Sequence, residues 1–170
     1  HSHLLASAIP SILAYDPGFA FEIGVIVKEG LRRMYENGED VFYYMTLHNE
    51  NYPMPEMPAG IEEGILKGLY RFRKGQEGLA YKAHILGSGA LIHAALGAQG
   101  ILARYGVSAD VWSATSYKQL RTETLNCRRW NMLHPEAEPK RSYLEQVLEK
   151  EKGTFVAVSD NMKIVSDQIA

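Results

Sequence analysis

An unbroken run of apolar, aromatic and β-branched residues at positions 41–47, VFYYMTL, most constrains how this chain can fold. A strand with one wet face alternates apolar and polar residues, whereas an unbroken run predicts a strand covered on both faces, usually in a parallel sheet. The preceding residues 17–36 carry apolar side chains at three- and four-residue steps, which predicts a helix. Asp16 and Pro17 suit the cap and the first turn of that helix. A buried parallel strand beside a helix indicates an α/β fold.

The rest of the chain alternates between helical and extended patterns. Pro53, Pro55 and Pro58 exclude a helix or a sheet ladder from residues 48–60, so this stretch is expected to be an extended linker. The alternation predicts a largely parallel sheet with helices on both faces, and the linker predicts two units, residues 1–57 and 58–170. Helices are expected at residues 61–72, 90–105, 118–125 and 142–150, strands at residues 80–86, 110–114 and 154–158, an irregular segment at residues 126–139, and a last helix cut short at Ala170.

Charge and composition exclude several classes of function. The 18 Lys and Arg residues nearly balance the 20 Asp and Glu residues, and no basic run exceeds two, so no nucleic-acid or anionic-membrane footprint is visible. Apolar stretches are broken well before the roughly 20 residues that span a bilayer, and no signal peptide opens the chain, which predicts a cytoplasmic protein. The single cysteine, Cys127, cannot form an internal disulfide. Arg128 and Arg129 beside it could lower the pKa of the thiol and make it reactive, but an inert thiol is the favoured interpretation.

Gly87, Ser88 and Gly89 follow a predicted strand and open a predicted helix. Unpaired N–H groups at such a turn can hold a phosphate. The third glycine of a dinucleotide fingerprint is absent, because Ile92 stands at its position. A glycine turn of this kind also serves tight packing in proteins without any ligand, and packing is the favoured interpretation.

The histidines show no zinc-site spacing, and one cysteine cannot complete such a site. Two other stretches each keep two interpretations. Residues 49–52 follow a predicted strand, where ligands often bind, although a polar linker would look the same and is the favoured interpretation. Residues 118–134 are rich in Arg and Trp, which suits either a protein-binding surface or a solvated loop. The histidines are His1, His3, His48, His84, His93 and His134.

Segments along nearly the whole chain carry a family resemblance. They are HSH at residues 1–3, SILAYDPGFAF at 11–21, GLRRMY at 30–35, NENYPMPEMPAG at 49–60, EEGILKGLY at 62–70, ILGSGALI at 85–92, ADVWSATSY at 109–117 and CRRWNMLHP at 127–135. In this order they resemble the decarboxylating first component of pyruvate dehydrogenase complexes, of the single-chain, homodimeric type within the transketolase-like thiamin-diphosphate enzymes. The chain resembles an internal or C-terminal piece of such an enzyme.

The resemblance implies a division of labour. Residues 1–57 would be the end of a pyrimidine-binding α/β domain, and residues 58–170 most of a transketolase-C-terminal-like three-layer domain. The family's Gly-Asp-Gly motif for diphosphate and magnesium is absent, as is its activating glutamate, so this piece alone is expected to bind neither thiamin diphosphate nor Mg²⁺ and to be inactive. His1 and His3 resemble the end of an active-site loop, and His3 is the favoured substrate-facing residue; a frayed terminus is the alternative.

For the intact enzyme, the resemblance implies decarboxylation of pyruvate and reductive acetylation of a lipoyl group on a dihydrolipoyl acetyltransferase partner. It also implies a homodimer. Two alternatives stay open: a non-catalytic α/β assembly or regulatory module, and a related enzyme acting on another 2-oxo acid or a sugar phosphate.

Overall fold

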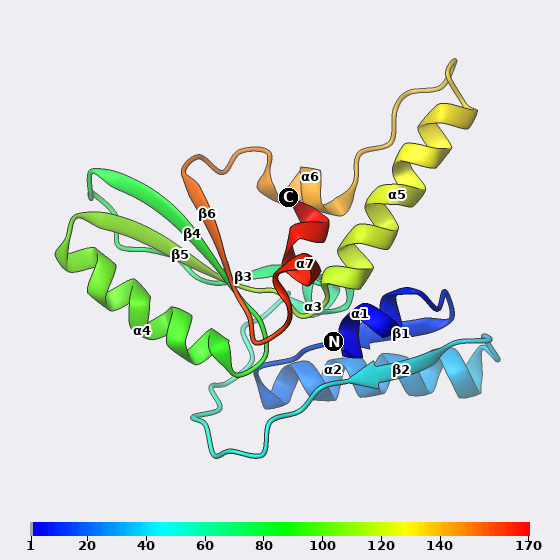
Figure 1. The fold of residues 1–170 in the computed structure, drawn as a ribbon, viewed down its shortest axis with the longest axis horizontal. Coiled ribbons are helices and arrows are strands. Elements are labelled where there is room, and N and C mark those ends of the chain that lie inside the picture. Colours follow the sequence, from blue (N-terminus) through cyan, green and yellow to red (C-terminus); the bar gives the residue numbers. More distant parts are fainter. Residues whose placement is uncertain (1) are drawn as a thin grey trace.

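The computed structural model describes residues 2–170, which form two sheets with helices around them (Figure 1). The first part of the chain contains α1 (Ser2–Ser7), β1 (Ile12–Tyr15), α2 (Ala20–Leu31), the π-helical turn η1 (Arg32–Glu36) and β2 (Phe42–Met45). The second part contains α3 (Glu62–Lys67), β3 (Tyr70–Arg73), β4 (Tyr81–Gly87), α4 (Leu91–Arg104), β5 (Val107–Ser113), α5 (Tyr117–Leu133), α6 (Tyr143–Leu148), β6 (Thr154–Val158), α7 (Lys163–Ser166) and the short helix η2 (Asp167–Ile169).

The first sheet pairs β1 with β2 in parallel, with Ile12 opposite Phe42 and Tyr15 opposite Met45. The predicted strand at residues 41–47 is therefore present and parallel, although shorter than expected. It is not covered on both faces, because Phe42 keeps 49% of its surface exposed. Its partner β1 was not predicted, since four residues are too few to establish a periodicity.

The second sheet has the strand order β3-β5-β4-β6. Strand β4 runs parallel to both β5 and β6, and β3 is antiparallel to β5. The α/β fold with a largely parallel sheet is thus confirmed. The predicted helix at residues 61–72 was wrong beyond Lys67, because Gly68 ends α3 with φ +108° and the chain turns into β3. A Cβ on Gly68 would lie 2.3 Å from the Ser116 carbonyl oxygen, so only glycine fits this turn.

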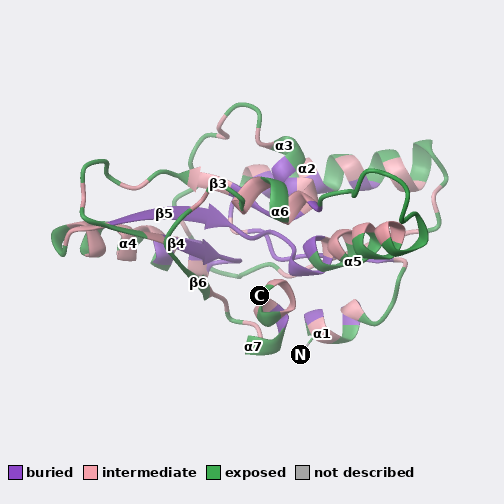
Figure 2. Cartoon of the chain, turned by 90° about the horizontal axis from the view of Figure 1, so that it is seen from above, coloured by how far each residue is buried: buried purple, intermediate pink, exposed green. Residues whose placement is uncertain are grey.

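The two faces of the second sheet are covered unequally. On one face α4 packs over Ile85 and Val111, and Phe19 from the first part of the chain joins that core. On the other face Leu86 and Trp112 pack with residues of α5 and α7. Figure 2 shows most of β5 and the C-terminal part of β4 buried, while the edge strand β6 is exposed. The prediction that helices cover both faces therefore holds only in part for residues 2–170.

Two helix boundaries differ from the predictions. Helix α2 begins at Ala20 rather than Pro17, because the Glu22 carboxylate accepts hydrogen bonds from the N–H groups of Gly18 and Phe19. Helix α5 runs to Leu133, so the irregular segment begins at His134 rather than after residue 125. Its polar outer surface lacks the apolar repeat from which a long helix can be recognised. Among residues 2–170, no helix has both the length and the apolar character that crossing a membrane requires.

Candidate functional site

A cluster of polar side chains lies where the carboxyl ends of parallel strands from both sheets converge. Asp16 follows β1, Thr46 follows β2, and Asn161 lies in the loop after β6. The carboxyl ends of parallel strands form the edge at which α/β proteins place ligands and catalytic groups. His3 reaches the same place from α1, close to the N-terminus marked in Figure 1. These four residues are called the His3 cluster.

Hydrogen bonds join the His3 cluster into one chain. The His3 Nε2 atom lies 2.9 Å from Thr46 Oγ1. Thr46 Oγ1 donates to Asp16 Oδ1 at 2.5 Å, and Asn161 Nδ2 donates to Asp16 Oδ2 at 3.1 Å. The cluster therefore links an imidazole, a hydroxyl, a carboxylate and an amide that are up to 158 positions apart in the sequence.

His3 is buried, with 7% of its surface exposed, and its ring meets the edge of Tyr44 at a centroid distance of 5.4 Å. Burial lowers the pKa of His3, and the negative charge of Asp16 opposes that shift without cancelling it. The imidazole is therefore neutral at physiological pH, the form that can both accept and donate a proton. The predicted residue His1 lies outside the described residues.

The cavity beside the cluster is small. Its volume is about 10 Å³, and its lining includes Ser7, Tyr117 and Gln168 besides His3 and Asp16. A space of this size holds about one water molecule, so residues 2–170 do not enclose room here for an organic substrate. Any substrate that His3 contacts must therefore be held by further protein surfaces.

The Gly87-Ser88-Gly89 turn packs against this cluster and offers no phosphate site. The Ser88 N–H donates to the Val158 carbonyl, and the Gly89 N–H donates to the Asp16 carbonyl. A Cβ on Gly89, whose φ is +53°, would lie 2.9 Å from Asp16 Oδ1. The glycine is therefore required by close packing, and N–H groups that a phosphate would need are already used.

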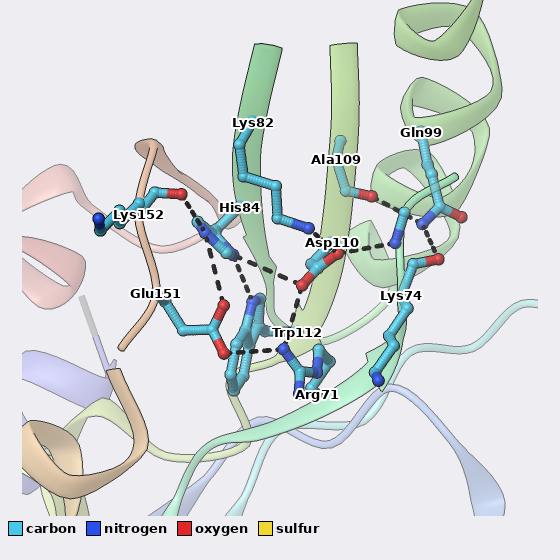
Figure 3. Close-up of polar contacts among 11 residues, drawn as sticks. Arg71, Lys74, Lys82, His84, Gln99, Ala109, Asp110, Trp112, Glu151 and Lys152 are labelled. Carbon is cyan, nitrogen blue, oxygen red and sulfur yellow. Dashed lines mark hydrogen bonds and ion pairs between the residues drawn. The ribbon is translucent and has the colours of Figure 1, made fainter. Parts of the chain in front are cut away.

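A second polar cluster, the Asp110 network, lies on the face of the second sheet opposite α4 (Figure 3). Asp110 accepts hydrogen bonds from Lys82 Nζ at 2.5 Å, the Gly75 N–H at 2.7 Å and Arg71 Nη1 at 3.2 Å. Arg71 also donates to Glu151 Oε1 at 2.8 Å. Burial alone raises the pKa of Asp110, but Lys82, the Gly75 N–H and Arg71 outweigh it and hold the pKa below its ordinary value.

Three side chains at the Asp110 network are of types that can bind a metal ion, but their contacts show that they do not form a metal site. One ligand atom each of His84, Asp110 and Glu151 lie within 4.8 Å of one another. Both His84 nitrogens are engaged, since Trp112 Nε1 donates to Nδ1 at 3.1 Å and Nε2 lies 3.1 Å from the Lys152 carbonyl. The carboxylates already bind two cations, so the network is an ion-paired support for the sheet. Sequence spacing does not reveal the Asp110 network, because it depends on the parallel register that pairs His84 with Asp110.

Three further candidates from the sequence, residues 49–52, Cys127 and residues 118–134, are not members of the His3 cluster. Tyr52 stacks on His93 at 4.6 Å and donates to Glu50, so residues 49–52 pack as part of an extended connection. Cys127 donates to Glu123, and burial together with that carboxylate raises the pKa of the thiol. The lowered thiol pKa suggested by Arg128 and Arg129 was therefore wrong, and the raised pKa agrees with the favoured interpretation of an inert thiol. Residues 118–134 are mainly helical, which corrects the solvated-loop alternative.

Lys118, which the sequence analysis did not single out, fixes the connection from α1 to β1. It is buried, and its Nζ atom donates to the carbonyl oxygens of Ala6, Ile9 and Ile12 at 2.5–2.9 Å. Burial lowers the pKa of Lys118. These contacts hold α1, the helix that carries His3, against α5. No local sequence pattern predicts this role of Lys118.

Comparison with known proteins assigns the two parts of the chain to two domain families. Residues 1–55 match the pyruvate dehydrogenase E1 component middle domain, and residues 68–170 match the transketolase-like TK C-terminal domain. The chain is 45% identical over 170 residues to a pyruvate dehydrogenase E1 component of Pseudomonas aeruginosa, and 45% identical over 171 residues to that of Escherichia coli K12. Each comparison covers 99% of this chain but only 19% of the relative.

A solved structure shows the same fold at lower sequence identity. A transketolase variant from Pichia stipitis superposes with a TM-score of 0.56 and 18% identity, over 93% of this chain and 20% of the transketolase. At this identity the likeness concerns the fold alone.

Proposed function

This chain belongs to the family of pyruvate dehydrogenase E1 components, and from that membership we propose that it forms part of a thiamin-diphosphate-dependent enzyme that decarboxylates pyruvate. In this proposal the intact enzyme then reductively acetylates the lipoyl group of a dihydrolipoyl acetyltransferase partner. Residues 1–57 are proposed as the end of the pyrimidine-binding domain, and residues 58–170 as most of the C-terminal domain. We place the enzyme in the cytoplasm.

The described residues do not fit the diphosphate or the magnesium ion of the cofactor. The Ser88 and Gly89 N–H groups donate to carbonyls, and the carboxylates of Asp110 and Glu151 bind Arg71 and Lys82. Thiamin diphosphate and Mg²⁺ are therefore proposed to bind elsewhere in the intact enzyme. We propose that this chain alone is inactive, because the cofactor supplies the carbanion chemistry of the reaction.

His3 is proposed to face the substrate in the intact enzyme. The single observation that carries this role is a buried imidazole, hydrogen-bonded to Thr46, at the carboxyl ends of strands from both sheets. Burying a histidine in neutral form costs free energy unless its polar atoms are bonded, and Thr46 supplies that bond. A neutral imidazole so placed can exchange a proton with a bound 2-oxo acid or its product.

Exposed apolar side chains support a larger assembly, proposed to be a homodimer within a multienzyme complex. Phe155 and Val156 on the edge strand β6 keep 40% and 49% of their surface exposed, and Met132 at the end of α5 keeps 79%. On the first sheet, Phe42 keeps 49% of its surface exposed and Leu47, which follows β2, keeps 60%. An open strand edge with apolar side chains normally binds further protein.

The test is the His3→Gln variant of the full-length enzyme that contains this chain. Loss of a proton-transfer group lowers kcat by roughly 100-fold or more, measured as pyruvate-dependent release of carbon dioxide. His134→Gln is the matched control, because His134 is exposed and caps α5 far from the His3 cluster. Equal activity of the His3→Gln variant and the wild type would show that His3 takes no part in the reaction.

A further inference from the structure

We infer that Thr46 and Asp16 are positioning residues that fix the tautomer of His3: they hold its proton on Nε2 and leave the lone pair on Nδ1. This inference rests on the proposed function, in which His3 faces the substrate. It names the atom, Nδ1, that acts there.

The tautomer follows from counting hydrogens. Thr46 carries one hydroxyl hydrogen, and the 2.5 Å contact directs it to Asp16 Oδ1. A carboxylate at neutral pH only accepts hydrogen bonds, so Asp16 cannot donate one back. Thr46 Oγ1 must then act as acceptor toward His3 Nε2, 2.9 Å away, which requires the proton on Nε2. A neutral imidazole has one N–H group, so Nδ1 is the basic atom.

Three further hydrogen bonds fix the position of Asp16, which keeps the hydroxyl hydrogen of Thr46 directed toward Asp16 Oδ1. Its N–H donates to the Thr115 carbonyl at 2.7 Å, and its carbonyl accepts from the Gly89 N–H at 2.9 Å. Its second carboxylate oxygen accepts from Asn161. Three contacts to Asp16 thus come from the second part of the chain, which makes the state of His3 in the first part depend on how the two parts pack.

The position of Thr46 in the sequence supports this role. Thr46 is the β-branched residue with a hydroxyl in the run at residues 41–47, and its N–H donates to the Tyr15 carbonyl at 3.1 Å, as in a continuing parallel strand. Valine has nearly the same shape, and both valine and threonine are enriched in strands, so only the hydroxyl distinguishes threonine here. The hydroxyl is therefore present for the two hydrogen bonds that it makes.

The experiment uses the full-length enzyme with isotope-labelled histidine and compares the wild type with Thr46→Val and Thr46→Ser. Long-range proton–nitrogen NMR spectra report which ring nitrogen of His3 carries the proton, and the signal is assigned by its loss in His3→Gln. Thr46→Val removes the acceptor and is expected to produce a mixture of tautomers and a fall in kcat of about tenfold, by analogy with the low end of the loss when a metal-bound histidine loses its hydrogen-bond partner. Thr46→Ser keeps the hydroxyl and should restore both the single tautomer and most of kcat.

The outcomes separate the inference from the proposed function. An unchanged His3 tautomer in a folded Thr46→Val enzyme, with its melting temperature near that of the wild type, would overturn the inference. A changed tautomer together with full activity of His3→Gln would leave the positioning by Thr46 intact and refute the substrate-facing role. A changed tautomer, a lowered kcat and rescue by Thr46→Ser would support both.

Discussion

Replacing Glu22 tests how the two parts of the chain are held together. Glu22 is fully buried, and its Oε2 atom accepts from the N–H groups of Gly18 at 2.6 Å and Phe19 at 3.0 Å. Its Oε1 atom accepts from Tyr70 Oη at 2.7 Å on β3 and from Ser113 Oγ at 2.6 Å on β5. Burial raises the pKa of Glu22, and these four donors oppose the shift. One side chain thus joins the start of α2 to the second sheet.

The two substitutions Glu22→Ala and Glu22→Gln should differ widely. Alanine leaves the buried Phe19 N–H and the part-buried Gly18 N–H without an acceptor, at roughly 1–3 kcal/mol each, so we expect a loss of about 4 kcal/mol in local stability. Glutamine keeps an oxygen for the two N–H groups and turns its amide nitrogen toward the hydroxyls of Tyr70 and Ser113, which can rotate to accept. Replacing charge-assisted by neutral hydrogen bonds should then cost only about 1 kcal/mol.

Hydrogen exchange of the Gly18 and Phe19 amides in the full-length protein measures this directly. About 4 kcal/mol corresponds to roughly a thousandfold faster exchange in Glu22→Ala, and about 1 kcal/mol to less than roughly tenfold in Glu22→Gln. Glu29→Ala on the same helix is the control, because its exposed pair with Arg32 contributes about 0–1 kcal/mol. Exchange in Glu22→Ala within tenfold of the wild type, or equal effects of both Glu22 variants, would refute the reasoning.

Two further predictions concern the His3 cluster, both read as melting temperatures. Gly89→Ala should destabilise by at least about 1–2 kcal/mol, because its φ of +53° is strained for alanine and its Cβ would press on Asp16; Gly97→Ala, which meets no atom within 4 Å inside α4, should instead stabilise by about 0.5–1 kcal/mol. Burial lowers the pKa of His3 in the folded state, so above pH about 6.5 the neutral ring contributes stability that is lost as the pH falls through this lowered pKa. The His3→Gln variant lacks this titrating group, so it should lose less stability than the wild type on acidification. An equal loss in both proteins would contradict the burial of a neutral His3.

The sequence predicted the elements that carry strong periodicity. The strands at residues 80–86 and 154–158 and the helix at residues 90–105 match β4, β6 and α4 to within a few residues. Errors arose where a single tertiary contact decided the outcome. Gly68 ends α3 because it packs on Ser116, and Glu22 moves the start of α2 by reaching back to Gly18. Such contacts join residues that are distant in sequence or depend on burial, so local patterns do not reveal them.

The candidate site was less predictable than the fold. His3 was selected only through family resemblance, because a histidine near a chain end has no periodic context. Its partners Thr46, Asp16 and Asn161 follow three separate strands, and their spacing in the sequence does not predict that they lie together. The Asp110 network likewise requires the register of β4 against β5. Side chains that converge from several strands become visible only once the topology is known.

The measurement that tests the account most directly is calorimetric titration of thiamin diphosphate and Mg²⁺ into this chain, beside the same titration of the full-length protein. We predict saturable binding by the full-length protein and no binding by residues 1–170, because the Gly87–Gly89 turn and the Asp110 network have no free groups for a diphosphate or a metal ion. Saturable binding by residues 1–170 would contradict this and would place a cofactor site within the chain itself.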